Sequence, residues 1–171
     1  MIDRSLADVR GAAGQRAQSQ LFSLADFIAE VKYASELAAD IRGSKFTVSH
    51  VDVNLAVVGD RDLLYAAIGN LLQNAFKFTH DHTEVTLNAY AAGDRILIDV
   101  KDHCGGLPPG SAERMFVPFT QNGPDRSGLG LGLSIARRSV KANDGTLTVC
   151  DAPSVGCVFT VSLPRYAVLA P

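Results

Sequence analysis

The spacing of apolar residues changes several times along the chain between a helical and an alternating pattern, and the order of these changes limits the possible folds. Helical spacing occurs in three segments, at 23–43, at 61–79 and after Gly132, and a pair of strand-like segments follows each of them. The resulting order is α, β, β, α, β, β, loop, α, β, β. Single helices between strand pairs predict an α+β fold: a two-layer α/β sandwich in which helices pack on one face of a mixed, mostly antiparallel sheet.

Capping residues and glycines set the expected limits of these elements. Ser23, in "SLAD", can cap the first helix and Gly43 can end it, whereas Asp60 can cap a second helix that runs to about Thr79. A hairpin is expected in "EVTLNAYAAGDRILIDVKD", with its turn near Gly93. The other expected strands are 45–51, 54–59, "GTLTVCD" and "CVFTVSLP". Two stripes recur at helical spacing: Leu24, Ile28, Val31, Ser35, Ala38 and Ile41 in the first helix, and Leu64, Ile68, Leu71, Ala75 and Phe78 in the second.

The composition fits one soluble globular domain. Of the 171 residues, 47% are hydrophobic and 20% are charged, which is enough apolar material for one sizeable core. The 16 basic and 18 acidic residues are interspersed, so we expect no nucleic acid partner and no direct membrane contact. No apolar run approaches the roughly 20 residues of a membrane helix, and any anchor of a parent protein is expected elsewhere. The first 20 residues are polar and are interpreted as a linker or a clipped helix.

Three cysteines, Cys104, Cys150 and Cys157, are an odd number in a chain without a signal-peptide pattern. This pattern predicts reduced thiols and a cytoplasmic location rather than a disulfide framework.

The second helix carries a polar edge beside its apolar stripe. At 100° per residue, Asn70, Asn74 and Lys77 fall within an arc of about 60°. Amide oxygens are ligands that suit Mg²⁺, and a lysine can neutralise phosphates as a point charge. The alternative is an ordinary polar flank on an amphipathic helix, and this helix by itself favours that alternative.

The strand "RILIDVKD" ends in an aspartate on the core side. Asp102 shares the parity of Ile96, Ile98 and Val100, so its carboxylate points toward the core and needs a donor. The exocyclic amine of adenine is such a donor, and Gly105 and Gly106 would let the backbone approach a flat ring. The alternative is that the aspartate merely closes a turn.

Three alternate glycines precede the last helix. Gly128, Gly130 and Gly132 lead into "LSIARRSVK", where the free N–H groups of a helix N-terminus form an anion site that the glycines allow to close on phosphate oxygens. The alternative is a flexible hinge.

Together, "NLLQNAFK", "DHCGGL", "MFVPF" and "GLGLGLS" resemble the N, G1, F and G2 boxes of the ATP-binding catalytic domain of sensor histidine kinases, in the GHKL or Bergerat-fold superfamily. The resemblance extends from about residue 22 to 165, and it implies a catalytic domain at 21–166, a tail at 167–171, and ATP held under a lid. The residues before 21 are then a linker or the clipped end of a dimerisation helix.

The resemblance implies a role for each box. Asn74 would coordinate Mg²⁺, Asn70 and Lys77 would support the metal and the phosphates, Asp102 would bind the adenine amine, and Gly106 would belong to the adenine-side turn. The other implied residues are Phe116, Pro118 and Phe119 in the F box, Arg126 in the lid, and Gly128, Leu129, Gly130, Leu131 and Gly132 against the phosphates.

The chain departs from the family pattern in the G1 box and in the lid. Cys104 stands at the middle position of the G1 box, where glycine is usual; we interpret it as a small buried residue, with a reactive thiol as the alternative. The lid is short, since about eight residues separate Phe119 from Gly128, and Arg126 is its candidate for reaching a phosphate.

The third departure concerns the phosphoacceptor, because no histidine lies in the family's phosphoacceptor context; the chain's histidines are His50, His80, His82 and His103. Hydrolysing relatives carry a glutamate where this chain has Asn70, and an amide cannot accept the proton of an attacking water. We therefore expect the chain to bind Mg·ATP and to pass the γ-phosphate to a histidine on a separate dimerisation domain, with a response regulator receiver downstream.

"FSLADFIAEV" supports this expectation, since it resembles the segment that follows dimerisation helices. The alternatives are a nucleotide-dependent switch without phosphotransfer and a serine kinase of the anti-sigma type.

Overall fold

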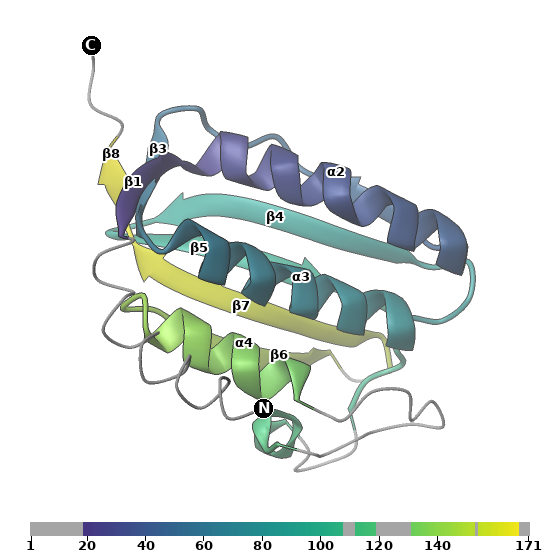
Figure 1. The fold of residues 1–171 in the computed structure, drawn as a ribbon. Coiled ribbons are helices and arrows are strands. Elements are labelled where there is room, and N and C mark those ends of the chain that lie inside the picture. The colour runs from purple at the N-terminus through teal and green to yellow at the C-terminus, as the bar shows by residue number, and fades with distance from the viewer. Residues whose placement is uncertain (1–18, 108–111, 119–130, 153, 168–171) are drawn as a thin grey trace, which may run out of the picture.

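The computed structural model describes residues 19–107, 112–118, 131–152 and 154–167, and Figure 1 shows three helices side by side over one face of a sheet. The helices are α2 (Leu24–Arg42), α3 (Arg61–Phe78) and α4 (Gly132–Lys141), and a short 3-10 helix, η1, spans Glu113–Phe116. The main sheet has the strand order β2 (Lys45–Val48), β4 (Glu84–Ala92), β5 (Arg95–Lys101), β7 (Gly156–Pro164), β6 (Thr146–Ala152). Only β2 and β4 pair in parallel in this sheet, so the predicted two-layer, mostly antiparallel sandwich is confirmed.

A second, three-stranded sheet was not expected from the sequence. Its order is β1 (Gln20–Ser23), β3 (Leu55–Gly59), β8 (Tyr166–Ala167), and both pairings are antiparallel. The predicted strand at 54–59 therefore lies outside the main sheet. Backbone pairing between segments as short as β1 and β8 leaves little trace in side-chain periodicity, which explains why the pattern of apolar residues did not reveal this sheet.

The predicted helix limits are confirmed. The Ser23 hydroxyl accepts a hydrogen bond from the backbone N–H of Asp26 at 3.2 Å, and Gly43 ends α2 with a left-handed φ of 68°. The Asp60 carboxylate accepts from the N–H of Leu63 at 3.1 Å and caps α3. These caps satisfy backbone groups that a helix terminus leaves unpaired.

The apolar stripe of α3 is buried as expected, except that Phe78 at the helix end is half-buried. In α2, Ile41 is an exception, because 76% of it is exposed. At 100° per residue, Ile41 lies about 100° from the centre of the stripe, whereas Phe27 and Ala39 lie about 60° to either side of that centre and are buried.

The predicted hairpin is formed by β4 and β5 and turns at Gly93, whose φ is 61°. Ile96, Ile98 and Val100 point from β5 into the core, and Asp102 follows them on the same side. This register determines the surroundings of Asp102, since a shift of one residue would have placed it on the opposite face.

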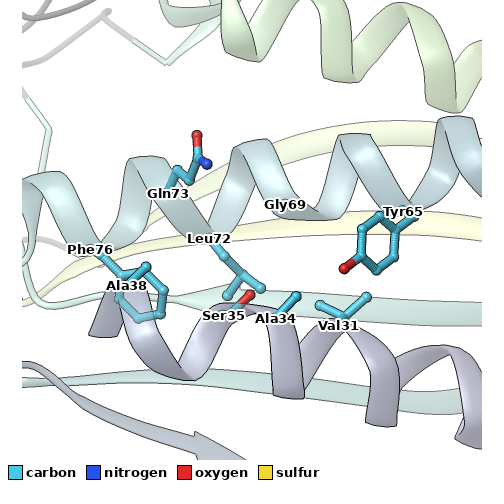
Figure 2. A pocket seen from close by; sticks show the side chains of 9 residues that line it. All are labelled: Val31, Ala34, Ser35, Ala38, Tyr65, Gly69, Leu72, Gln73 and Phe76. Carbon is cyan, nitrogen blue, oxygen red and sulfur yellow. The ribbon is translucent and has the colours of Figure 1, made fainter. Parts of the chain in front are cut away.

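A shallow pocket lies between α2 and α3, on the side of α3 that faces α2 (Figure 2). Val31 and Ala38 of α2 line it together with Tyr65, Gly69 and Phe76 of α3. None of the residues expected to bind a nucleotide lines this pocket. Among the described residues, no helix is both long and apolar enough to cross a membrane.

Candidate functional site

The predicted polar edge of α3 lies next to the beginning of α4. Asn70, Asn74 and Lys77 are half-buried, and the Asn70 side-chain amide donates to the carbonyl oxygen of Gly132 at 3.4 Å. Because Nδ2 is used in this bond, Oδ1 of Asn70 remains the side-chain acceptor. The structure therefore brings one of the two predicted amides to the last of the three predicted glycines, although 62 residues separate them in sequence.

Leu131 is the N-cap residue of α4, and its side chain forms no capping hydrogen bond. The carbonyl oxygen of Leu131 accepts from the Ile135 N–H at 2.9 Å and from the Ser134 hydroxyl at 2.9 Å, whereas Gly132 is exposed. Within the described residues, the N–H groups of this first turn therefore have no N-cap side chain as acceptor, and such groups bind anions. The other predicted residues of the lid and glycine segment lie outside the described residues: Phe119, Arg126, Gly128, Leu129 and Gly130.

Asp102 follows β5 as a buried carboxylate of which 1% is exposed. Its Oδ1 accepts from the backbone N–H groups of Cys104 at 3.1 Å and of Cys157 at 3.2 Å. The donors that the sequence required are therefore backbone groups, which compensate part of the cost of burial. Within the described residues, Oδ2 has the Cys157 thiol as its contact, at 3.6 Å, and thiols are weak donors. Oδ2 of Asp102 can therefore still accept a hydrogen bond from a stronger donor.

Gly156, which the sequence did not single out, makes this position of Asp102 possible. A Cβ atom on Gly156 would lie 2.1 Å from the Asp102 carbonyl oxygen and 2.9 Å from its Oδ1. No side chain fits at such distances, so β7 must begin with a glycine. The signal in the sequence was weak, since a glycine at the start of a strand usually indicates a turn.

The loop after Asp102 is bonded to the end of α3. The His103 N–H donates to the Thr79 hydroxyl at 3.0 Å, and the His80 N–H donates to the His103 carbonyl at 3.0 Å. Gly105 and Gly106 have φ values of 89° and 99°, in the region that favours glycine, and a Cβ on Gly105 would lie 3.0 Å from the His80 ring. The ring that lies close to the backbone of Gly105 in this structure is therefore the imidazole of His80.

Three of the four histidines lie on the surface, and the fourth lies beside β4. His50, His80 and His82 are exposed, and His103 is half-buried with its Nδ1 at 2.6 Å from the Glu84 carbonyl oxygen.

The F box begins with a buried anchor. Phe116 packs edge-to-face on Phe159 with ring centroids 6.2 Å apart, and the Arg137 guanidinium lies 4.2 Å from the centre of the Phe116 ring. Arg137 also forms an ion pair with Glu113 at 3.0 Å, whereas Pro118 is exposed. Arg137 thus joins η1 to α4, a role that the sequence analysis missed because cation–π partners have no fixed spacing.

The three cysteines differ in environment: Cys150 is exposed, Cys104 is half-buried and Cys157 is buried, and no disulfide joins them. Burial, with a smaller contribution from Asp102, raises the pKa of the Cys104 thiol. The same two causes raise the pKa of the Cys157 thiol further. These directions favour the interpretation of Cys104 as a packed, weakly reactive residue.

The comparison with known families identifies the family of the chain. The family described as "Histidine kinase-, DNA gyrase B-, and HSP90-like ATPase", HATPase_c, matches residues 59–167, which include α3, the loop after Asp102 and α4. The chain belongs to this family. The resemblance that the four boxes indicated is therefore confirmed, and the HATPase_c domain is of the sensor histidine kinase type.

The curated relatives are much longer proteins than this chain. Sensor histidine kinase RcsC of Escherichia coli (strain K12) is 39% identical over 124 residues, and Sensor protein TorS of the same organism is 36% identical over 120 residues. Each alignment covers 70% of this chain and 13% of the relative. The chain thus spans a small part of the relatives that it matches.

Solved structures agree on the fold. ShkA, solved as the full-length protein in complex with AMPPNP, superposes with a TM-score of 0.77 at 26% identity, over 90% of this chain and 32% of ShkA. The catalytic domain of histidine kinase ThkA, in a nucleotide-free form, gives a TM-score of 0.76 at 24% identity, over 85% of this chain and 95% of that one. The HATPase_c domain therefore has the Bergerat fold.

Proposed function

We propose that the chain binds Mg·ATP and donates the γ-phosphate to a histidine on a separate dimerisation and phosphoacceptor domain. The arrangement around α3 carries the proposal: Asn70 lies against the first residue of α4, and Thr79 is bonded to the loop that follows Asp102. These two positions are about 14 Å apart along a helix axis. A nucleotide would find groups for its phosphates and for its base at two places along one helix.

Asp102 is the residue we assign to the adenine. The exocyclic amine of adenine is a donor, and Oδ2 of Asp102 has only a thiol contact within the described residues. Guanine presents a carbonyl oxygen at the corresponding position, and a carboxylate repels it. The backbone N–H groups of Cys104 and Cys157 hold Oδ1, so the carboxylate cannot easily turn to suit another base. Gly106, with its positive φ, belongs to the turn on this side of the site.

The donor set of α3 fits Mg²⁺. Asn74 and Asn70 offer half-buried amide oxygens one helical turn apart, and the bond from Asn70 to Gly132 leaves its oxygen available. We assign Asn74 to the metal, and Asn70 and Lys77 to support of the metal and the phosphates. Mg²⁺ would neutralise phosphate charge there. Leu131 and Gly132, with Gly128, Leu129 and Gly130 before them, are assigned to the phosphates, and Phe119 and Arg126 to the lid.

The chemistry assigned to the domain is positioning and charge neutralisation. The bond between the γ-phosphorus and the ADP oxygen breaks, a bond to an imidazole nitrogen of the acceptor forms, and ADP leaves with the electron pair. Neither amide can act as a base toward water. The isolated chain should therefore hydrolyse ATP slowly, because its groups favour transfer to a nucleophile that needs no deprotonation by this domain.

The relatives support the partners that we propose. Full-length sensor kinases are the proteins matched by this chain, and the neighbour ShkA was solved with AMPPNP. We propose a catalytic domain at 21–166 that acts with a dimerisation and phosphoacceptor domain, in the same protein or in another, and with a response regulator receiver downstream. We place its action in the cytoplasm.

Phosphotransfer to a separate phosphoacceptor domain tests the proposal. The full chain is incubated with γ-labelled ATP, Mg²⁺ and a purified histidine-kinase dimerisation domain, and the label is followed at acid and alkaline pH. We expect acid-labile label on the histidine of the acceptor domain and little free phosphate when that domain is absent. Acid-stable label would identify a serine kinase, nucleotide binding without transfer would identify a switch, and rapid hydrolysis by the chain alone would refute the division of roles.

Asp102→Asn tests the adenine assignment separately. An asparagine Oδ1 can still accept from the two backbone N–H groups, so the fold should be retained, whereas the amide nitrogen replaces the acceptor at Oδ2. We expect ATP affinity to fall by ~1–3 kcal/mol, the scale of a hydrogen bond to a charged group. Calorimetric titrations with ATP and GTP measure it. Unchanged affinity for ATP and unchanged discrimination against GTP would contradict the assignment.

A further inference from the structure

Three potential metal ligands meet at the start of β7. The Sγ atoms of Cys104 and Cys157 are 3.6 Å apart, and the Cys157 Sγ is 3.6 Å from Oδ2 of Asp102. The ligand atoms of all three residues lie within 4.8 Å of one another. Nothing in the proposed kinase chemistry uses either thiol, although 53 residues separate the two cysteines and the fold has brought them together.

The two 3.6 Å separations match edges of a zinc coordination tetrahedron. With Zn–S bonds of about 2.3 Å and a Zn–O bond of about 2.1 Å, tetrahedral angles give a sulfur–sulfur edge of about 3.8 Å and a sulfur–oxygen edge of about 3.6 Å. The observed 3.6 Å edges therefore need little adjustment. A disulfide would require the two sulfurs to approach to about 2.05 Å. The geometry suits a shared cation better than a covalent bond.

The carboxylate is already oriented for such a ligand. Oδ1 of Asp102 is held by the N–H groups of Cys104 and Cys157, and Oδ2 is left toward the sulfurs. Hydrogen bonds to the second oxygen of a ligating carboxylate fix its direction and raise metal affinity. Cys104 is half-buried, so the cluster has one side from which an ion can enter.

We propose that Cys104, Cys157 and Asp102 form a site for a thiophilic divalent cation, with Zn²⁺ as its probe, and that this cation competes with adenine for the Asp102 carboxylate. The competition rests on the proposed function, whereas the metal site does not. A fourth ligand would come from solution, as at zinc sites with three protein ligands. The cation would make nucleotide binding sensitive to available zinc.

Proton release follows from the state of the thiols. An ordinary thiol carries its proton at neutral pH, and zinc binds the thiolate form. Binding then proceeds as Zn²⁺ plus two thiols and one carboxylate giving a monoanionic complex and two protons. The negative charge of Asp102 favours the thiol over the thiolate, and it also attracts the dication that displaces those protons.

Calorimetry on the full, reduced chain tests the metal site. Zn²⁺ is titrated in two buffers of different ionisation enthalpy, and Co²⁺ is added in parallel to observe sulfur-to-metal charge transfer and tetrahedral d–d bands. We expect one Zn²⁺ per chain, release of two protons, and both cobalt signals. Cys104→Ser and Cys157→Ser should each weaken binding at least about tenfold. Cys150→Ser is the matched control and should bind as the parent does, because Cys150 is exposed and outside the cluster.

The outcomes separate the two parts of the proposal. The site would be overturned if the parent bound no zinc. It would also be overturned if Cys104→Ser and Cys157→Ser both kept zinc binding while thermal unfolding showed that they were folded. If Cys157→Ser does not fold, Cys104→Ser alone decides the test, because Cys104 is only half-buried. Adenosine then probes competition, because it carries the purine without zinc-chelating phosphates. Saturating Zn²⁺ should weaken adenosine binding at least about tenfold in the parent and not in Cys104→Ser. Zinc binding that leaves adenosine affinity unchanged would overturn the competition and the adenine assignment while the metal site remains.

Discussion

Gly156→Ala should damage the site through the backbone rather than through a lost side chain. The added Cβ would lie 2.1 Å from the Asp102 carbonyl oxygen and 2.8 Å from its carbonyl carbon, both of which belong to the backbone. Ordinary contact begins at about 3.4 Å, so the start of β7 and the end of β5 must separate by more than 1 Å. That movement strains the bonds that join Asp102 to Cys157, in which Asp102 donates at 3.1 Å and accepts at 3.2 Å.

The size of the effect follows from overpacking of a buried site. Forced insertion of a methyl group costs about 1–3 kcal/mol, and contact with the backbone of Asp102 rather than with a flexible side chain places Gly156→Ala in the upper half of that range. For a domain of this length, a loss of about 2–3 kcal/mol lowers Tm by roughly 4–12 °C. ATP affinity should fall as well, because the displaced carboxylate is the group assigned to adenine.

Gly69→Ala is the matched control. Gly69 lies inside α3 and lines the pocket between α2 and α3 (Figure 2). Apart from the backbone of α3 itself, no atom of the described residues lies within 4 Å of the Cβ that it would gain. The same substitution should stabilise the helix there by about 0.5–1 kcal/mol. Differential scanning calorimetry and ATP titration of both variants give the comparison. If Gly156→Ala melts within about 1 °C of the parent, or if Gly69→Ala is destabilised as much, the steric reasoning is wrong.

Other predictions concern Asn74, the contact of Arg137 with Phe116, and the three thiols. Asn74→Ala should abolish the Mg²⁺ dependence of ATP affinity and leave Tm unchanged, measured by titration with and without Mg²⁺; a loss of Tm would mean a structural role. Arg137→Gln removes the stacked guanidinium that joins η1 to α4 and should lower the free energy of unfolding by about 1 kcal/mol in urea, whereas an unchanged midpoint would contradict this contact. At pH 8, iodoacetamide should modify the exposed Cys150 well before Cys104 and Cys157, because burial raises the pKa of the latter two thiols and keeps them protonated until the pH rises further. Mass spectrometry of the three cysteine-containing peptides measures the rates of modification, and similar rates for all three cysteines would contradict this prediction.

Local signals allowed much of the fold to be predicted. Ser23 and Asp60 cap their helices through hydrogen bonds three residues along the chain, and Gly43 ends α2 in a left-handed conformation. The position of Asp102 followed from strand alternation, because each residue of β5 faces opposite to its neighbour. Each of these inferences needed only a few consecutive residues, and each was confirmed.

Contacts between distant segments could not be predicted in this way. The strands β1 and β8 pair with β3 through backbone groups, which every residue carries and which therefore mark no sequence position. The fit of Gly156 against Asp102 and the stacking of Arg137 on Phe116 depend on how elements pack. Spacing along the chain contains no information on either contact.

The two ends of the candidate site depend on different parts of the fold. Asn70 and Gly132 meet where α3 packs on α4, whereas the surroundings of Asp102 come from the pairing of β5 with β7. Packing of two helices tolerates small shifts, but a carboxylate held by two backbone N–H groups and a glycine with no room for a Cβ does not. Substitutions between α3 and α4 should therefore change metal and phosphate affinity gradually, and those at the start of β7 should remove base discrimination abruptly. If graded substitutions at the two ends changed metal affinity and base discrimination in the same gradual way, the sheet and the helices would have to move as one unit. Base recognition and phosphate recognition would then not be separate in this domain.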